Sequence, residues 1–315
     1  MTMVSPALLA VLAALFLWWF STGALIWLAR IGAGMGGARG KAMVLAGAFA
    51  LLVASLAGSA ALSGSATVEA AYLSFLCGLG AWGFVELTFL TGIVTGPVTR
   101  PCPPGATGLR RFRLALGTLL WHEFAILAVG AALVALAWGA PNQTGAWSFA
   151  LLMGLRVSAK LNLFLGVPYP PTALLPRPLA HLESYFRIRP FTALLPITIT
   201  AATALATLVA WRAASPALDP FHATAYALFW TLLVLGIAEH WFLILPVRES
   251  ALWRWFLERE TTPAPPLAQG GEETAADRRG KASGTGAIGA RRAYLPGTKR
   301  GASNEKGGTA SPKPA

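Results

Sequence analysis

The residues best suited to chemistry are seven ionisable side chains that interrupt otherwise apolar stretches: Glu86, His122, Glu123, Arg156, Lys160, Glu239 and His240. Carboxylates, imidazoles and cations together can bind a metal ion, hold a pigment, pass a proton or neutralise one another. A charge near the middle of a bilayer costs roughly 2.5 kcal/mol or more, so such residues usually face one another or a wet cavity. The pattern predicts one intramembrane polar cluster to which four helices contribute.

The composition predicts the membrane setting that this argument needs. The 315 residues are 55% hydrophobic and 12% charged, with a mean hydropathy of +0.59. These values indicate a polytopic integral membrane protein and exclude soluble classes. Seven apolar runs are long enough to cross a hydrocarbon core of roughly 30 Å as helices. They lie near residues 7–28, 42–62, 68–94, 114–138, 147–167, 191–211 and 222–245. The expected fold class is therefore all-α, with about seven transmembrane helices.

The distribution of basic residues predicts the orientation of these helices. Arginine and lysine gather after the first, third and fifth runs, at Arg30, Arg39, Lys41, Arg100, Arg110, Arg111, Arg113, Arg177, Arg187 and Arg189. Such connections are normally cytoplasmic, which puts the N-terminus outside and the C-terminus inside. The excess of basic residues, a net charge of +12, is thus explained by the orientation of the helices in the membrane and by contact with anionic lipid headgroups. No motif points to nucleic acid as a partner.

The composition divides the chain into three parts. Residues 1–246 form the seven-helix transmembrane domain. Residues 247–260 (RESALWRWFLERE from position 248) mix aromatic and charged side chains, as a helix lying in the headgroup layer does. Residues 261–315 turn to Pro, Ala, Gly, Ser and scattered charges, which predicts a disordered basic tail.

Counting residues from the expected cytoplasmic helix ends puts the cluster in the cytoplasmic half of the bilayer. Glu86 and His122 come out ~12–14 Å deep, and Lys160 and Glu239 ~9–10 Å deep. Arg156 and Lys160 are four apart and share a face. The adjacent pairs His122–Glu123 and Glu239–His240 diverge by roughly 100°, so only one member of each pair can point straight inward.

A short helix in the loop after the fifth run can cover the cluster from the cytoplasm. The segment AHLESYF carries His181, Glu183 and Tyr185 and is bounded by Pro178 and Pro190. We therefore expect these three residues to form a cytoplasmic lid.

The residues alone leave four interpretations of the cluster open. In the first, the three glutamates pair with Arg156 and Lys160, and these charge-neutralising pairs only hold the helices together. In the second, carboxylates with His122, His240 and His181 bind iron, manganese or zinc, although adjacent His–Glu pairs differ from the Glu-x-x-His of di-iron bundles. In the third, His122 or His240 ligates the metal of a tetrapyrrole, with Trp82, Trp121 and Trp241 around the ring. The fourth is proton or solute transport.

Several long motifs resemble a known family. They are TGIVTGPVTRPCPPGATGLRRFRLA at 91–115, WHE at 121–123, WGAPNQTGAW at 138–147, RVSAKLNLFLGVP at 156–168, HLESYFR at 181–187 and EHWFLILP at 239–246. Together they make residues 7–260 similar to the photosynthetic complex assembly proteins of the PuhE type. The resemblance implies a multi-pass protein of the cell inner membrane, including the intracytoplasmic photosynthetic membrane. It also implies a role in assembling the reaction centre with its core antenna and an influence on bacteriochlorophyll supply. It implies no catalytic residue.

These lines lead to one hypothesis and one alternative. The hypothesis is an assembly factor in the lipid bilayer whose cytoplasmic-side polar pocket binds bacteriochlorophyll or a precursor, or docks a reaction-centre or core-antenna subunit. In the pigment version, His122 or His240 is the axial ligand. The alternative is a membrane metalloenzyme of tetrapyrrole metabolism, in which Glu86, Glu123, Glu239 and the histidines hold a transition metal.

Overall fold

The structure, a computed structural model, describes residues 6–34, 38–172 and 175–246. Its internal contacts divide the chain into Met1–Thr262 and Pro263–Ala315, and all described residues belong to the first unit. The expected headgroup-layer segment at 247–260 and the expected tail at 261–315 lie outside the described residues. Both stay predictions.

Seven described helices are long and apolar enough to cross a membrane, which confirms the all-α, seven-span prediction. They are α1 (Pro6–Gly34), α2 (Ala38–Leu62), α3 (Val68–Leu90), α5 (Leu120–Ala137), α6 (Thr144–Leu165), α7 (Leu194–Ala213) and α8 (Pro220–Phe242). Two short elements, α4 (Gly108–Gly117) and the 3₁₀ helix η2 (Arg177–Tyr185), lie in the connections. The described residues form no strand beyond an isolated bridge between Val167 and Ile188. Which end of the bundle is cytoplasmic stays a prediction.

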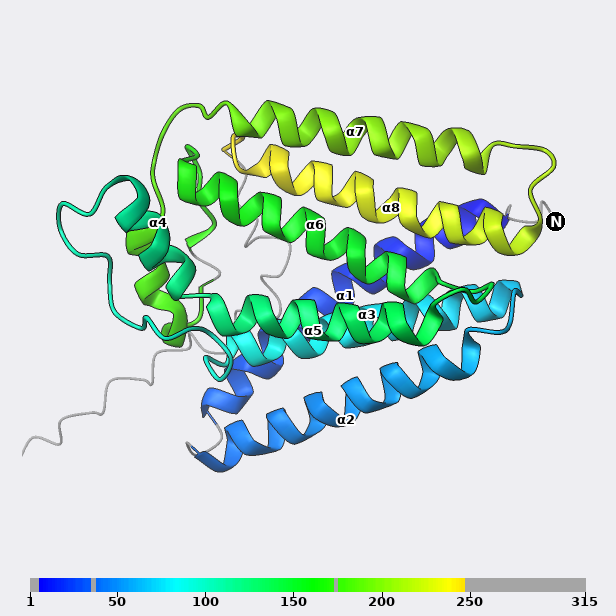
Figure 1. Cartoon of the computed structure of the whole chain (residues 1–315), viewed down its shortest axis with the longest axis horizontal. Helices are drawn as coiled ribbons and strands as arrows, with labels where there is room; N and C mark the ends of the chain where they lie inside the picture. Colours follow the sequence, from blue (N-terminus) through cyan, green and yellow to red (C-terminus); the bar gives the residue numbers. More distant parts are fainter. Residues whose placement is uncertain (1–5, 35–37, 173–174, 247–315) are drawn as a thin grey trace, which may run out of the picture. The chain divides into compact units, whose positions relative to one another are not determined.

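Helices α3 and α8 form the centre of the bundle. More than half of the apolar stretch of each is buried, whereas α7 is mostly exposed and packs chiefly against α8. Helix α3 contacts α1, α2, α5, α6 and α8, and Figure 1 shows it running among them. A polar residue on the inner face of α3 is therefore surrounded by other helices.

Small residues bring α3 and α6 into close contact. The backbone N–H of Gly145 donates to Ser74 Oγ at 2.9 Å. A Cβ atom on Gly78 would lie 2.5 Å from the carbonyl oxygen of Gly145. Glycine and serine thus allow the two backbones to approach, as small residues do in many membrane bundles. Farther along the same seam, the rings of Trp82 and Phe149 meet edge to face with centroids 5.4 Å apart.

Helix α1 crosses its neighbours obliquely (Figure 1). Its 29 residues extend about 43 Å, more than a core of about 30 Å needs, so tilting is the expected response. The first half of α1 packs through Ala10 and Ala14 against α3 and α8. Its second half packs through Ala29 against α2 and α3.

The predicted fourth span, 114–138, is two elements, α4 and α5, separated at Thr118 and Leu119. The loop after α3 causes the break, because it supplies hydrogen bonds that a continuous helix would supply itself. The N–H of Val98 donates to the carbonyl of Gly117 at 3.1 Å, and the N–H of His122 donates to the carbonyl of Thr95 at 2.9 Å.

These boundaries correct the expected depths. Helix α3 ends at Leu90, just before Gly92 takes a φ of +76° that turns the chain. Glu86 is then four residues from the end of α3, and His122 is two residues from the start of α5. At about 1.5 Å per residue both lie roughly 3–6 Å from their helix ends. The polar residues therefore gather near one end of the bundle, where the counting argument placed them deeper.

The orientation can be tested with Cys102, which lies in the loop between α3 and α4. In a Cys77→Ser background, a membrane-impermeant maleimide is expected to label Cys102 in inside-out vesicles and not in intact spheroplasts, because this loop is predicted to be cytoplasmic. Cys102→Ser is the control for background labelling. Labelling of spheroplasts and not of inside-out vesicles would show that the orientation is reversed.

Candidate functional site

A cavity of about 330 Å³ lies between α1, α3, α6 and α8 and is bounded at one end by the α4–α5 connection and by η2. Small-molecule sites span about 300–1,000 Å³, so this space lies at the lower end of their range. Most of its wall is apolar or aromatic, including Trp18, Leu25, Leu79, Trp82, Phe89, Leu152, Leu155, Phe164 and Phe242. Four residues of the predicted cluster also line it: Glu86, Arg156, Lys160 and Glu239. We call this space the central cavity.

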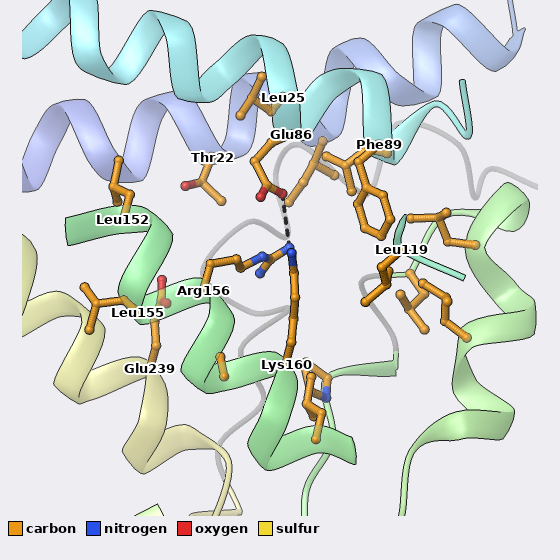
Figure 2. A pocket seen from close by; sticks show the side chains of 18 of the residues that line it. Thr22, Leu25, Glu86, Phe89, Leu119, Leu152, Leu155, Arg156, Lys160 and Glu239 are labelled. Carbon is orange, nitrogen blue, oxygen red and sulfur yellow. Dashed lines mark hydrogen bonds and ion pairs between the residues drawn. The ribbon is translucent and has the colours of Figure 1, made fainter. Parts of the chain in front are cut away.

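An ion pair between α3 and α6 forms one wall of the central cavity. Arg156 Nη2 donates to Glu86 Oε2 at 3.1 Å, the contact drawn dashed in Figure 2. The Glu86 side chain is 8% exposed and that of Arg156 is 42% exposed. Because Arg156 lies inside the bundle and lines the cavity, its accessible surface faces the cavity.

The Arg156 guanidinium has hydrogen-bonding capacity left over. Glu86 takes one of its five N–H donors, and the buried Nε has no partner among the described residues. Glu239, on α8, also attracts Arg156 electrostatically and lines the same cavity. The exposed part of the guanidinium can therefore also donate to a molecule in the cavity.

A second ion pair joins α6 to α5. Lys160 Nζ donates to Glu123 Oε1 at 2.7 Å, and both side chains are largely buried. Lys160 lines the central cavity, while Glu123 lies behind it. The cavity wall thus carries two cations, each held by a carboxylate of a neighbouring helix.

The two intramembrane histidines do not line the cavity. His122 is fully buried, stacks on Phe89 with centroids 4.3 Å apart, and has its Nε2 4.0 Å from Glu86 Oε1. His240 donates from Nδ1 to the carbonyl of Gly236 at 2.7 Å, and its Nε2 contacts Ser158 Oγ. Both ring nitrogens of His240 therefore have partners within the bundle. This arrangement does not favour either histidine as an axial ligand.

The predicted divergence of adjacent residues is visible on α8, where Glu239 lines the cavity and His240 packs toward α6. Within residues 6–34, 38–172 and 175–246, no group of three or more His, Cys, Asp or Glu is placed to hold a metal ion. The geometry of the donors therefore does not favour the metalloenzyme alternative.

The expected lid segment forms η2, and its apolar side faces the cavity. Leu179, Leu182 and Tyr185 line the cavity, while Glu183 is exposed and His181 is half-buried beside it. Burial lowers the pKa of His181 and raises the pKa of Tyr185. Tyr185 Oη donates to the carbonyl of Arg100 at 3.2 Å, which ties η2 to the loop after α3. Of the three predicted lid residues, only Tyr185 reaches the cavity.

Arg111 has a structural role that the sequence did not reveal. The sequence groups it with Arg110 and Arg113 as an orientation signal, but it is buried whereas the other two are exposed. Its guanidinium donates to the carbonyls of Phe164, at 3.0 Å, and of Tyr185, and lies 4.1 Å from the centroid of the Phe164 ring. Arg111 thus joins α4, α6 and η2 at the closed end of the cavity.

The fold and the site define a polytopic membrane protein with seven spans and an internal cavity lined by paired charges. The chain belongs to the family described as a protein of unknown function, DUF3623, which matches residues 3–264. It is 39% identical over 267 residues to the uncharacterized 30.4 kDa protein in the puhA 5′ region of Rhodobacter capsulatus. The match covers 85% of this chain and 96% of that protein. No solved structure matches the chain.

A double-mutant cycle tests the Glu86–Arg156 pair. Glu86→Gln and Arg156→Gln are each expected to lower the free energy of unfolding in mixed micelles, because each leaves one charge without its partner. The double variant should have a free energy of unfolding about 1–3 kcal/mol higher than the sum of the two single effects predicts. A control cycle joins Glu86→Gln with Arg212→Gln on α7 and should be additive. Additivity in the Glu86–Arg156 cycle would contradict the pairing.

Arg111→Lys tests the closed end of the cavity. A lysine cannot reach both carbonyls with the planar geometry of a guanidinium, so η2 should lose protection from hydrogen exchange. The matched control is Arg110→Lys on the exposed side of the same helix, for which no change is expected. Equal protection of η2 in the two variants would show that Arg111 does not hold it.

Proposed function

We propose that this protein is an inner-membrane factor for assembly of the photosynthetic reaction centre and core antenna, and that its central cavity binds bacteriochlorophyll or a precursor. Three observations support the proposal. The family resemblance of the loop motifs implies this role, and a relative that matches 85% of this chain is described as lying in the puhA 5′ region. The third is the site itself, a ligand-sized cavity with paired charges inside a membrane bundle.

The observation that carries the pigment assignment is the Arg156 guanidinium on an otherwise mostly apolar wall. Bacteriochlorophyll combines a broad apolar ring with ketone and ester oxygens, which accept hydrogen bonds and carry no net charge. The spare donors of Arg156 match such acceptors, and a charge-assisted hydrogen bond in a dry site is stronger than a neutral one. The aromatic side chains of Trp82 and Phe89 line the same space and suit the faces of a planar ring.

The role of each cavity residue follows from its position. Arg156 orients the ligand through its carbonyl oxygens, and Glu86 fixes the guanidinium for that task. Lys160, held by Glu123, adds a second donor one helical turn away. Glu239 is a carboxylate on the opposite wall, from α8. The bound pigment supplies the light-absorbing macrocycle and its magnesium. The proposal requires no imidazole ligand, in keeping with the positions of His122 and His240.

The test is to express the chain in phototrophically grown Rhodobacter capsulatus, purify it in mild detergent, and record the absorption spectrum and the metal content of one sample. A bound tetrapyrrole is expected. Ala159→Trp, which fills the cavity from α6, should remove most of it. Val157→Trp, exposed on the same helix, should retain it.

Two results would contradict the pigment assignment. A near-stoichiometric transition metal without pigment would support the metalloenzyme alternative. A sample with neither metal nor pigment would leave a factor that docks subunit helices and whose buried charges serve the fold.

A further inference from the structure

Two connections at the end of the bundle that holds η2 are rich in arginine. They are residues 91–119, between α3 and α5, and residues 166–193, between α6 and α7. Together they contain one acidic residue, Glu183, and seven arginines: Arg100, Arg110, Arg111, Arg113, Arg177, Arg187 and Arg189. An arginine that only orients helices can lie anywhere in such a connection. A binding site requires arginines that the fold brings together.

Arg187 and Arg189 lie on a short extended segment that is bonded to the end of α6. The N–H of Val167 donates to the carbonyl of Arg187 at 3.0 Å, and the N–H of Arg189 donates to the carbonyl of Val167 at 3.3 Å. Alternate residues of an extended segment point to the same side, so the two arginines share one side and Ile188 points to the other. Gly166 leaves room for the second arginine, since a Cβ atom there would lie 2.9 Å from Cγ and Cδ of Arg189.

Arg111 lies near these two arginines and has no carboxylate to balance its charge. Its buried side chain donates to backbone carbonyls, which are neutral. Burial, and after it repulsion from Arg187 and Arg189, lowers the pKa of Arg111. Within the described part of the chain, no carboxylate forms an ion pair with any of the three. We call Arg111, Arg187 and Arg189 the arginine cluster. Because buried charges in proteins are normally paired, the cluster favours an anion as its ligand.

The arginine cluster lies at the depth expected for lipid headgroups. Helix α6 ends at Leu165 and α7 begins at Leu194, and both are long and apolar enough to cross the membrane. The segment with Arg187 and Arg189 lies between these two ends. Ile188 is 79% exposed and Phe191 is 65% exposed on the same connection. Exposed apolar side chains beside charged ones are typical of a membrane interaction site.

We propose that the arginine cluster binds the phosphate of an anionic phospholipid, whose acyl chains cover Ile188 and Phe191. Arg187 and Arg189 contact the phosphate, because the planar donors of a guanidinium match its oxygens. Arg111, which is buried, adds its positive charge without contacting the lipid. The lipid supplies the negative charge that the cluster lacks. The site does not depend on what the central cavity binds.

The charge of the cluster predicts which lipids it selects. A zwitterionic phospholipid also has a phosphate, but it carries a cation a few bonds away that the arginines repel. An anionic phospholipid has no such cation. A preference for the anionic headgroup at equal acyl chains is therefore the expected signature of the site.

The experiment is native mass spectrometry of the detergent-purified protein after incubation with phosphatidylglycerol and phosphatidylcholine, at equal concentrations and with identical acyl chains. The wild type is expected to retain phosphatidylglycerol several-fold more than phosphatidylcholine. The double variant Arg187→Gln with Arg189→Gln should lose this preference. The matched control, Arg110→Gln with Arg113→Gln, removes the same charge at exposed positions of α4 and should keep it.

Thermal unfolding of the same proteins checks the fold and the source of the phosphate. Phosphatidylglycerol should raise the melting temperature of the wild type and of the control and leave that of the Arg187 and Arg189 double variant unchanged. Inorganic phosphate at the same concentration should have no effect. Arg189→Gln alone changes an exposed side chain and should weaken the preference, so the test does not depend on the folding of the double variant.

Three results would overturn the site. Equal loss of the preference in the two double variants would show a general attraction of basic connections for anionic lipid. A preference that survives in both double variants would place the lipid elsewhere. Equal stabilisation by inorganic phosphate would indicate a soluble anion instead of a phospholipid.

Discussion

The structure depends on one constraint, that a charge inside the bundle must have a partner. Arg156 on α6 meets this constraint through Glu86 on α3, the helix that contacts most of the others. One turn along α6, Lys160 meets it through Glu123 on α5. Breaking such a pair leaves an uncompensated buried charge, which costs about 3–5 kcal/mol in proteins. The two pairs thereby fix the rotation of α6 about its axis and direct its cationic face toward the central cavity.

The same constraint explains why the pairs also suggest function. Ion pairs that served only to join helices could lie in a fully packed interface, with every donor used. Here the Arg156 side chain is 42% exposed and lines the central cavity, and its buried Nε has no partner among the described residues. The apolar walls around it lower the local dielectric and strengthen any hydrogen bond made there. A site of this kind selects for acceptor atoms on an apolar molecule.

The lengths of the apolar runs in the sequence predicted the seven spans, because each span must cover the same membrane thickness. Helical periodicity also predicted that Glu239 and His240 diverge. It could not predict the break between α4 and α5, since the bonds that replace the helix there come from the distant residues Thr95 and Val98. Helical periodicity also could not predict that Arg111 is buried while Arg110 and Arg113 are exposed. Only the contacts of Arg111 with Phe164 and Tyr185 distinguish it from the other two. His122 and His240 were candidates by residue type alone, and periodicity could not predict that neither lines the central cavity.

The central claim is that Arg156 holds an apolar ligand through its carbonyl oxygens. The most direct test is a cryo-electron microscopy map of the protein purified from phototrophically grown cells. The account predicts density for a planar ring in the central cavity, with an oxygen within hydrogen-bonding distance of the Arg156 guanidinium. A cavity closed by its own side chains, or a pigment bound elsewhere on the protein, would contradict it.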